Sequence, residues 1–103
     1  MKALLLTPED TVATVLQATA AGDELDVLMD GAVCGSIRAI EEIPYGFKIC
    51  VKPMAKGAPV IKYAHTIGRA TSDIAPGALV HVNNVEGGRG RGDLGDEDKG
   101  DNQ

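Results

Sequence analysis

The chain has 103 residues, of which 44% are hydrophobic, and a formal net charge of −5. This length fits one domain with a genuine core, and the lack of a basic stripe argues against nucleic acid as a partner, because nucleic-acid binding requires neutralised phosphates. With no apolar run near the ~20 residues of a membrane helix and no recognisable signal peptide, we expect no membrane partner and a cytoplasmic location.

The predicted elements at the start of the chain are two short strands. Residues 2–6 form the first strand, which ends at a Thr-Pro-Glu-Asp turn. Residues 11–18 are ambiguous, because Asp10 could cap a short helix while the valines and threonines that follow favour a strand. We predict a strand here, followed by a brief helical turn at residues 18–21.

The rest of the domain is predicted to be built from hairpins. Strands at residues 24–29 and 32–37 flank Asp30-Gly31, which is a strong signal for a two-residue hairpin turn. The remaining strands are expected at residues 48–52, 60–63, 67–70 and 79–85, with 60–63 and 67–70 joined across 64–66.

A short phrase, with apolar residues three positions before and three after a glycine, occurs four times. Glycine reaches positive φ without a Cβ clash, so each copy predicts a tight corner that leads into a strand. The uneven spacing of the copies argues against a solenoid and favours a small, bent, all-β domain. The copies are Thr19–Leu25, Ile43–Ile49, Met54–Val60 and Ile74–Val80, and Thr19 is the one polar residue at an apolar position.

The composition changes at residue 86. Residues 86–103 hold six glycines and one large apolar residue, Leu94, so this segment cannot bury enough surface to fold alone. We therefore predict a domain over residues 1–85 and a flexible tail over 86–103. The Arg-Gly-Arg-Gly-Asp run in the tail is either a solubilising segment or one that becomes ordered when its arginines grip the carboxylates of a partner.

Few side chains in this sequence could carry chemistry. There are two histidines, His65 at a predicted hairpin tip and His81 near the end of the last strand, and no third obvious metal ligand. Cys34 and Cys50 lie on apolar runs and are expected to be reduced core thiols. The glycine-rich segment after residue 86 is not followed by a helix, which excludes a dinucleotide site. This inventory predicts a domain that assists a reaction performed elsewhere.

Several phrases resemble the SAF-type domain of the altronate/galactarate dehydratase family. They occur in the family's order and cover most of the chain, and the resemblance implies a β-clip fold. The phrases are IPYGFKI at 43–49, PVIKY at 59–63, IGRAT to VHVNN at 67–84, and RGRGD at 89–93.

The resemblance also implies a function. Members of this family remove water from sugar acids such as altronate or galactarate, and a close branch eliminates sulfite from sulfolactate. The divalent metal, usually iron, is held by the family's large domain, so this chain is expected to carry no cofactor of its own. The chain is similar to a separate small subunit that completes the active site of a large catalytic subunit.

Candidate site residues follow from the matching positions. His81 and Asn84 match the His-x-His-Asn ending of the family, in which Asn83 replaces the second histidine, and they are the expected catalytic residues. Lys62 matches a Lys-Tyr-Gly phrase in which Ala64 replaces the glycine. The matching tail residues, expected to bind the substrate or the partner together with Lys62, are Arg89, Arg91 and Asp93.

Two other functions are compatible with the residues. The chain could be a stand-alone β-clip module that binds an anionic carbohydrate or a protein, or a structural adaptor. A lyase subunit should need Arg89 and Arg91, whereas a stand-alone binder should tolerate truncation at Val85.

Overall fold

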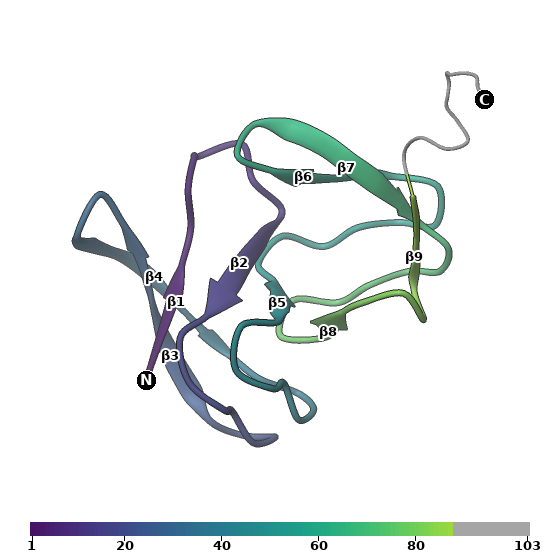
Figure 1. The fold of residues 1–103 in the computed structure, drawn as a ribbon. Helices are drawn as coiled ribbons and strands as arrows, with labels where there is room; N and C mark the ends of the chain where they lie inside the picture. The colour runs from purple at the N-terminus through teal and green to yellow at the C-terminus, as the bar shows by residue number, and fades with distance from the viewer. Residues whose placement is uncertain (88–103) are drawn as a thin grey trace.

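The computed structural model describes residues 1–87, which form nine strands in two sheets (Figure 1). The all-β prediction is confirmed. No helix in this range is long and apolar enough to cross a membrane. The strands are β1 (Lys2–Leu4), β2 (Val12–Val15), β3 (Glu24–Met29), β4 (Ala32–Arg38), β5 (Lys48–Cys50), β6 (Pro59–Lys62), β7 (His65–Ala70), β8 (Leu79–Val80) and β9 (Val85–Gly87).

The larger sheet has six strands in the order β4-β3-β1-β2-β5-β8, and the smaller sheet has three in the order β6-β7-β9. All pairs are antiparallel except β1 with β3. The hairpin of β6 and β7 lies across one end of β2, and β9 rises from the level of β8 to pair with β7 (Figure 1). Thr11 joins the sheets, because its N–H donates to Ile61 O (2.9 Å) and its hydroxyl accepts from Ile61 N–H (3.0 Å).

Two aliphatic clusters form the core, and strands β2 and β5 contribute to both. Neighbouring residues of a strand point to opposite faces, so Ile49 belongs to the first cluster and Cys50 to the second. The side chain of Phe47 is only partly buried and packs against the first cluster from outside. The buried residues of that cluster are all aliphatic, as predicted. The first cluster comprises Ala3, Leu5, Ala13, Val15, Leu25, Val27, Ala39, Ile43 and Ile49; the second comprises Val12, Cys50, Met54, Val60, Ala70, Ile74, Ala78 and Val80.

The four repeated phrases form four corners of the same type. Each glycine has a φ between 83° and 92°, and the residue after it donates its N–H to the carbonyl three positions earlier. This is the hydrogen bond of a type II turn, in which the third residue needs positive φ. The corner glycines are Gly22, Gly46, Gly57 and Gly77, so the prediction of four glycine corners is confirmed.

The corners pair two by two. Thr19 bridges Ile43, and Met54 bridges Ile74, in both cases through two reciprocal hydrogen bonds of 2.7–3.0 Å. Each corner glycine also donates its N–H to a carbonyl four residues before the bridging residue of the other corner. These bonds run from Gly22 to Ala39, from Gly46 to Val15, from Gly57 to Ala70 and from Gly77 to Cys50.

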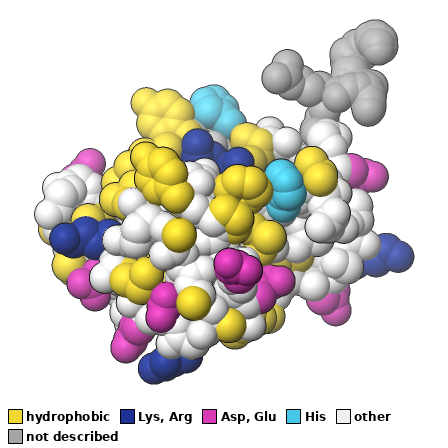
Figure 2. All heavy atoms as spheres, turned by 60° about the horizontal axis from the view of Figure 1, so that its bottom comes forward, with side chains coloured by type: hydrophobic (Ala, Val, Ile, Leu, Met, Phe, Trp, Pro, Cys, Tyr) yellow, Lys and Arg dark blue, Asp and Glu magenta, His cyan; other side chains and the backbone are white. Residues whose placement is uncertain are grey.

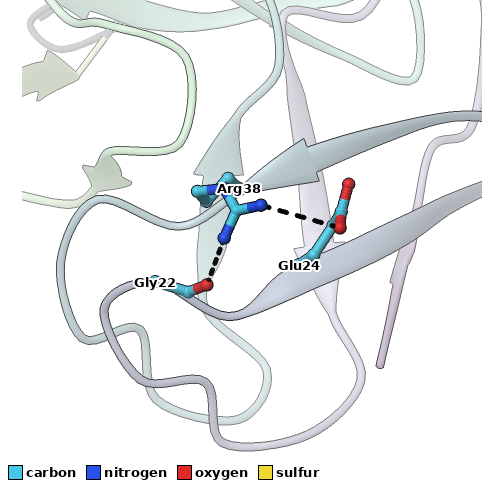
Figure 3. Close-up of polar contacts among 3 residues, drawn as sticks. All are labelled: Gly22, Glu24 and Arg38. Carbon is cyan, nitrogen blue, oxygen red and sulfur yellow. Dashed lines mark hydrogen bonds and ion pairs between the residues drawn. The ribbon is translucent and has the colours of Figure 1, made fainter.

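The hairpin of β3 and β4 has the predicted turn. Asp30 and Gly31 have φ values of 53° and 79°, as a type I′ turn requires. At the base of the hairpin, Arg38 donates to the carbonyl of Gly22 (2.9 Å) and lies 3.8 Å from the carboxylate of Glu24 (Figure 3). These exposed contacts connect the hairpin to the first corner and contribute little energy.

Three predictions about local structure were wrong. The helical turn expected at residues 18–21 is a bridge and a β-turn, because the backbone of Thr19 pairs with Ile43. The strand expected at residues 79–85 is interrupted by a turn at 81–84. Cys34 is exposed on the edge strand β4 and is not a core thiol, whereas Cys50 is buried as expected.

The end of the domain and the second hairpin also differ in detail. Strand β9 continues to Gly87, two residues past the predicted boundary at Val85. The turn between β6 and β7 consists of Tyr63 and Ala64 alone, and His65 already belongs to β7.

Candidate functional site

The loop between β8 and β9 carries two of the predicted site residues, His81 and Asn84. The side chain of Asn84 is fully engaged with the backbone of this loop: its oxygen accepts from His81 N–H (2.9 Å) and its amide donates to Leu79 O (2.8 Å). The backbone carbonyl of Asn84 accepts from Thr71 N–H (2.8 Å), which anchors the loop to the segment after β7. The side chain of Asn84 therefore holds the backbone of His81 in place within this loop.

The imidazole of His81 is exposed but oriented by one aromatic neighbour. Its ring centroid lies 4.8 Å from that of Phe47, with the planes tilted by 55°. Such tilted contacts are favourable arrangements of aromatic rings. Phe47 follows the second corner directly, so this corner sets the orientation of the His81 ring. Figure 2 shows the two histidine side chains of the chain on one face, among hydrophobic side chains and with basic side chains between them.

A cavity of about 210 Å³ opens beside His81, where the two sheets meet. A second hollow of about 160 Å³ lies on the other side of the same residues. Lys48, Val80 and His81 line both hollows, and Lys48 pairs with Val80 in the β5–β8 ladder. The larger cavity is lined by Lys48, Val60, Ile67, Val80, His81, Val82, Val85 and Gly87. An ammonium group and an imidazole thus share a mainly apolar recess.

The other predicted site residues are not brought together with His81 by the described structure. Lys62 pairs with His65 at the turn end of the β6–β7 hairpin, whereas β9 pairs with the opposite end of β7, from Gly68 to Ala70. Lys62 lines neither hollow beside His81. The predicted tail residues Arg89, Arg91 and Asp93 lie outside the described residues.

Asp10 is a buried carboxylate whose role the sequence did not reveal. Its oxygens accept hydrogen bonds from the hydroxyl and N–H of Thr7 and from the N–H groups of Tyr63 and Ala64, each of the latter at 2.9 Å. Burial alone would raise the pKa of Asp10, but these four hydrogen bonds outweigh it and hold the pKa below its ordinary value. Asp10 does not cap a helix. It clamps the β6–β7 turn.

This clamp explains an unusual feature of the turn. Tyr63 and Ala64 have φ values of 55° and 62°, in the left-handed region that non-glycine residues rarely adopt. The family that the sequence resembles has glycine at the position of Ala64, which fits such a backbone without strain. The Asp10 carboxylate holds the strained turn in place and presents the exposed Tyr63 at its tip.

The buried thiol of Cys50 is poorly suited to catalysis. Burial raises the pKa of the Cys50 thiol to about 11, and the thiol donates to the carbonyl of Lys52 (2.9 Å), so it is a poor nucleophile at neutral pH. Within residues 1–87, no group of three or more His, Cys, Asp or Glu side chains could hold a metal ion. The groups of the recess beside His81 that could transfer a proton or bind an anion are the imidazole of His81 and the ammonium group of Lys48.

Sequence reasoning missed two residues of this recess, Lys48 and Phe47. The local pattern did not mark them: Phe47 directly follows the corner glycine Gly46, and Lys48 opens strand β5, and both are ordinary positions for such residues. Their contact with His81 depends on β5 pairing with β8, which local sequence patterns do not specify.

The sequence of the chain is similar to those of several known proteins. The family described as the altronate/galactarate dehydratase SAF domain matches residues 1–88. The altronate dehydratase of Escherichia coli (strain K12) is 38% identical over 76 residues, which are 74% of this chain but only 14% of that enzyme. The (2R)-sulfolactate sulfo-lyase subunit alpha of Chromohalobacter salexigens is 34% identical over 70 residues, covering 63% of this chain and 74% of that subunit.

Proposed function

The chain belongs to the altronate/galactarate dehydratase SAF-domain family, its all-β fold is that of a small SAF β-clip domain, and from this premise we propose that it is the small subunit of a sugar-acid hydro-lyase. It completes the active site of a separate large subunit, which holds a divalent metal, expected to be iron. The support for a subunit role is the match to a relative that is named as one subunit of a lyase and is covered over 74% of its length.

The observation that carries this proposal is the exposed His81, held by Asn84 and Phe47 at the mouth of an apolar recess. Elimination of water from a hydroxy acid needs a base, a polarised carboxylate and an assisted leaving group. We assign the proton transfer to His81, because its imidazole is exposed and lines the cavity, and histidine is the side chain that most often acts as a general acid or base. Asn84 is a positioning residue for His81, since both of its polar atoms bind the backbone.

Arg89 and Arg91 complete the proposed site from the tail. They follow Gly87, which lines the cavity, by two and four positions. We assign Arg89, Arg91 and Asp93 to binding of the partner subunit or the substrate, with Lys62 as a weaker candidate.

The second candidate is the small subunit of a sulfolactate sulfo-lyase. The match to the relative from Chromohalobacter salexigens favours it. Altronate and sulfolactate are both hydroxycarboxylates, and a dehydratase and a sulfo-lyase differ in the group that leaves. The same recess could serve either reaction, with the large subunit deciding between them.

The test is reconstitution with the large subunit of the same family from the same genome. We expect the pair to eliminate water from altronate or galactarate, or sulfite from (2R)-sulfolactate, and the chain alone to do neither. His81→Ala should lower turnover of the pair by ~10²-fold or more, because general acid–base groups typically contribute that much. His65→Ala, the other exposed histidine, is the matched control.

Three results would count against the proposal. Full turnover by this chain alone would remove the need for a partner. Failure to bind any dehydratase-like large subunit would favour a stand-alone binding module, and such a module should also tolerate truncation after Gly87. An unchanged rate for His81→Ala in the active pair would reject the proton-transfer role.

A further inference from the structure

Lys48 is rigidly placed at the centre of the recess beside His81. Its strand, β5, is paired on both sides, and Lys48 itself lies between Thr14 of β2 and Val80 of β8. The side chain is half-buried and lines both hollows that flank His81. A lysine with this backbone support loses less freedom on binding a ligand than one on a mobile loop.

The charge of Lys48 is not used by the fold. Three other cations of the described part are bound to backbone carbonyls: Arg38 to Gly22, Lys52 to Pro8 and Arg69 to Gly57. Lys48 makes no such bond within residues 1–87, and the ion pair found in this range joins Arg38 to Glu24. Among the described residues that line the cavity beside His81, Lys48 is the one lysine or arginine, and its ammonium group is left for a ligand.

We propose that Lys48 binds the carboxylate of the acid substrate and thereby places the substrate against His81. This inference rests on the proposed function and names a specific residue and ligand group for it. Apolar side chains line the same cavity as Lys48, among them Val60, Val80 and Val85, and they should strengthen the attraction between ammonium and carboxylate relative to a fully exposed pair. The carboxylate is the group that altronate, galactarate and sulfolactate share, so Lys48 serves binding regardless of which group leaves.

The matched variants are Lys48→Met, Lys48→Arg and Lys56→Met. Methionine keeps most of the aliphatic stem and so preserves the packing of the cavity, while it removes the charge. Arginine keeps the charge. Lys56 is exposed on the third corner and lines neither hollow beside His81, so Lys56→Met controls for the loss of one positive charge.

In the reconstituted pair, Lys48→Met should raise KM for the acid that the pair turns over (altronate, galactarate or sulfolactate) by roughly 10- to 100-fold, with kcat changed far less, as expected for loss of a charged substrate contact. Lys48→Arg should recover part of the loss, and Lys56→Met should behave like the unchanged chain. An active pair in which Lys48→Met and Lys56→Met have the same KM overturns the inference about Lys48 and leaves the proposed function intact.

A second measurement decides the question if no active pair is obtained, which would itself be a failure of the proposed function. The full chain alone is titrated with galactarate and followed by NMR at the His81 ring and the Lys48 side chain. Saturable shifts that disappear in Lys48→Met and persist in Lys56→Met support carboxylate binding by Lys48. Shifts that are absent, do not saturate or survive Lys48→Met contradict it.

Discussion

At the residue scale, Asp10 shows how one buried charge can determine a local conformation. A buried carboxylate is costly unless its hydrogen bonds are satisfied. Here four donors satisfy it, and two of them come from a turn more than 50 residues away in sequence. The energy of these bonds offsets the left-handed conformations of Tyr63 and Ala64.

This arrangement predicts a pH-dependent stability. The pKa of Asp10 is lower in the folded chain than its ordinary value of 3.8, so the ionised form favours folding. The contribution is complete above the unfolded-state pKa and is lost as the pH falls through the lower folded-state pKa. Asp10→Asn should reduce the free energy of unfolding by about 2 kcal/mol at pH 7. The reason is that the side-chain NH₂ group of asparagine is itself a donor and would face backbone N–H groups that need an acceptor.

Urea unfolding at several pH values measures this effect, and Asp26→Asn on the exposed face of β3 is the control. The difference between Asp10→Asn and the unchanged chain should shrink below the ordinary carboxyl pKa. A difference that stays constant down to the lowest accessible pH would show that the carboxylate charge does not stabilise the turn.

Sequence reasoning at this scale selected His81 and Asn84 as candidate site residues but did not predict the hydrogen bonds between them. A histidine before an asparagine pair is visible in the sequence, and the family resemblance draws attention to it. The hydrogen bonds that occupy the Asn84 side chain arise from the turn at 81–84, which also interrupts the predicted strand. Lys48 escaped notice because a lone lysine in a strand has no local signature of binding.

At the element scale, the four corners were the most predictable part of the fold. Positive φ is a local requirement that glycine meets and that neighbouring residues hardly change, so the repeated phrase was a reliable signal. Which corner pairs with which could not be read from the phrase, because the partners are 20 or more residues apart in sequence. Pairing is a tertiary property and follows from the core that the strands share.

The corners differ in how closely they are packed, and this predicts unequal effects of one substitution. A Cβ at Gly57 would meet open space, whereas a Cβ at Gly77 would overlap the carbonyl oxygen of Arg38. Gly57→Ala should therefore cost about 1 kcal/mol for the left-handed conformation alone. Gly77→Ala should cost about 3 kcal/mol, because the backbone must also move.

Thermal and urea unfolding of both variants test this prediction, with each serving as the other's control. Equal losses of stability would mean that Arg38 can move away at little cost. Since the Gly77 corner leads directly into β8, the same substitution should also disturb the His81 loop, which the NMR signal of the His81 ring reports.

At the scale of the whole molecule, the recess beside His81 exists because two sheets meet there. Its lining comes from β5 and β8 of the larger sheet, from β6, β7 and β9 of the smaller one, and from the loop between β8 and β9. The sequence predicted the fold class and most strands, since these depend on local patterns and short turns. It could not predict the recess, which depends on the packing of segments from residue 48 to residue 87.

Because Cys34 is exposed and Cys50 is buried, the reactivity of the two thiols can report local opening of the protein. Cys34 should react with a thiol reagent at once, whereas Cys50, shielded by the second cluster, should react only when that cluster opens. Its sulfur lies 3.8 Å from the carbonyl of Ile74, so its labelling rate reports release of the third and fourth corners. Mass spectrometry at low urea measures both rates, with Cys34→Ser isolating the slow one, and similar rates would contradict the buried position of Cys50. The two natural cysteines thus allow the rate of local opening near the recess to be measured without any introduced label.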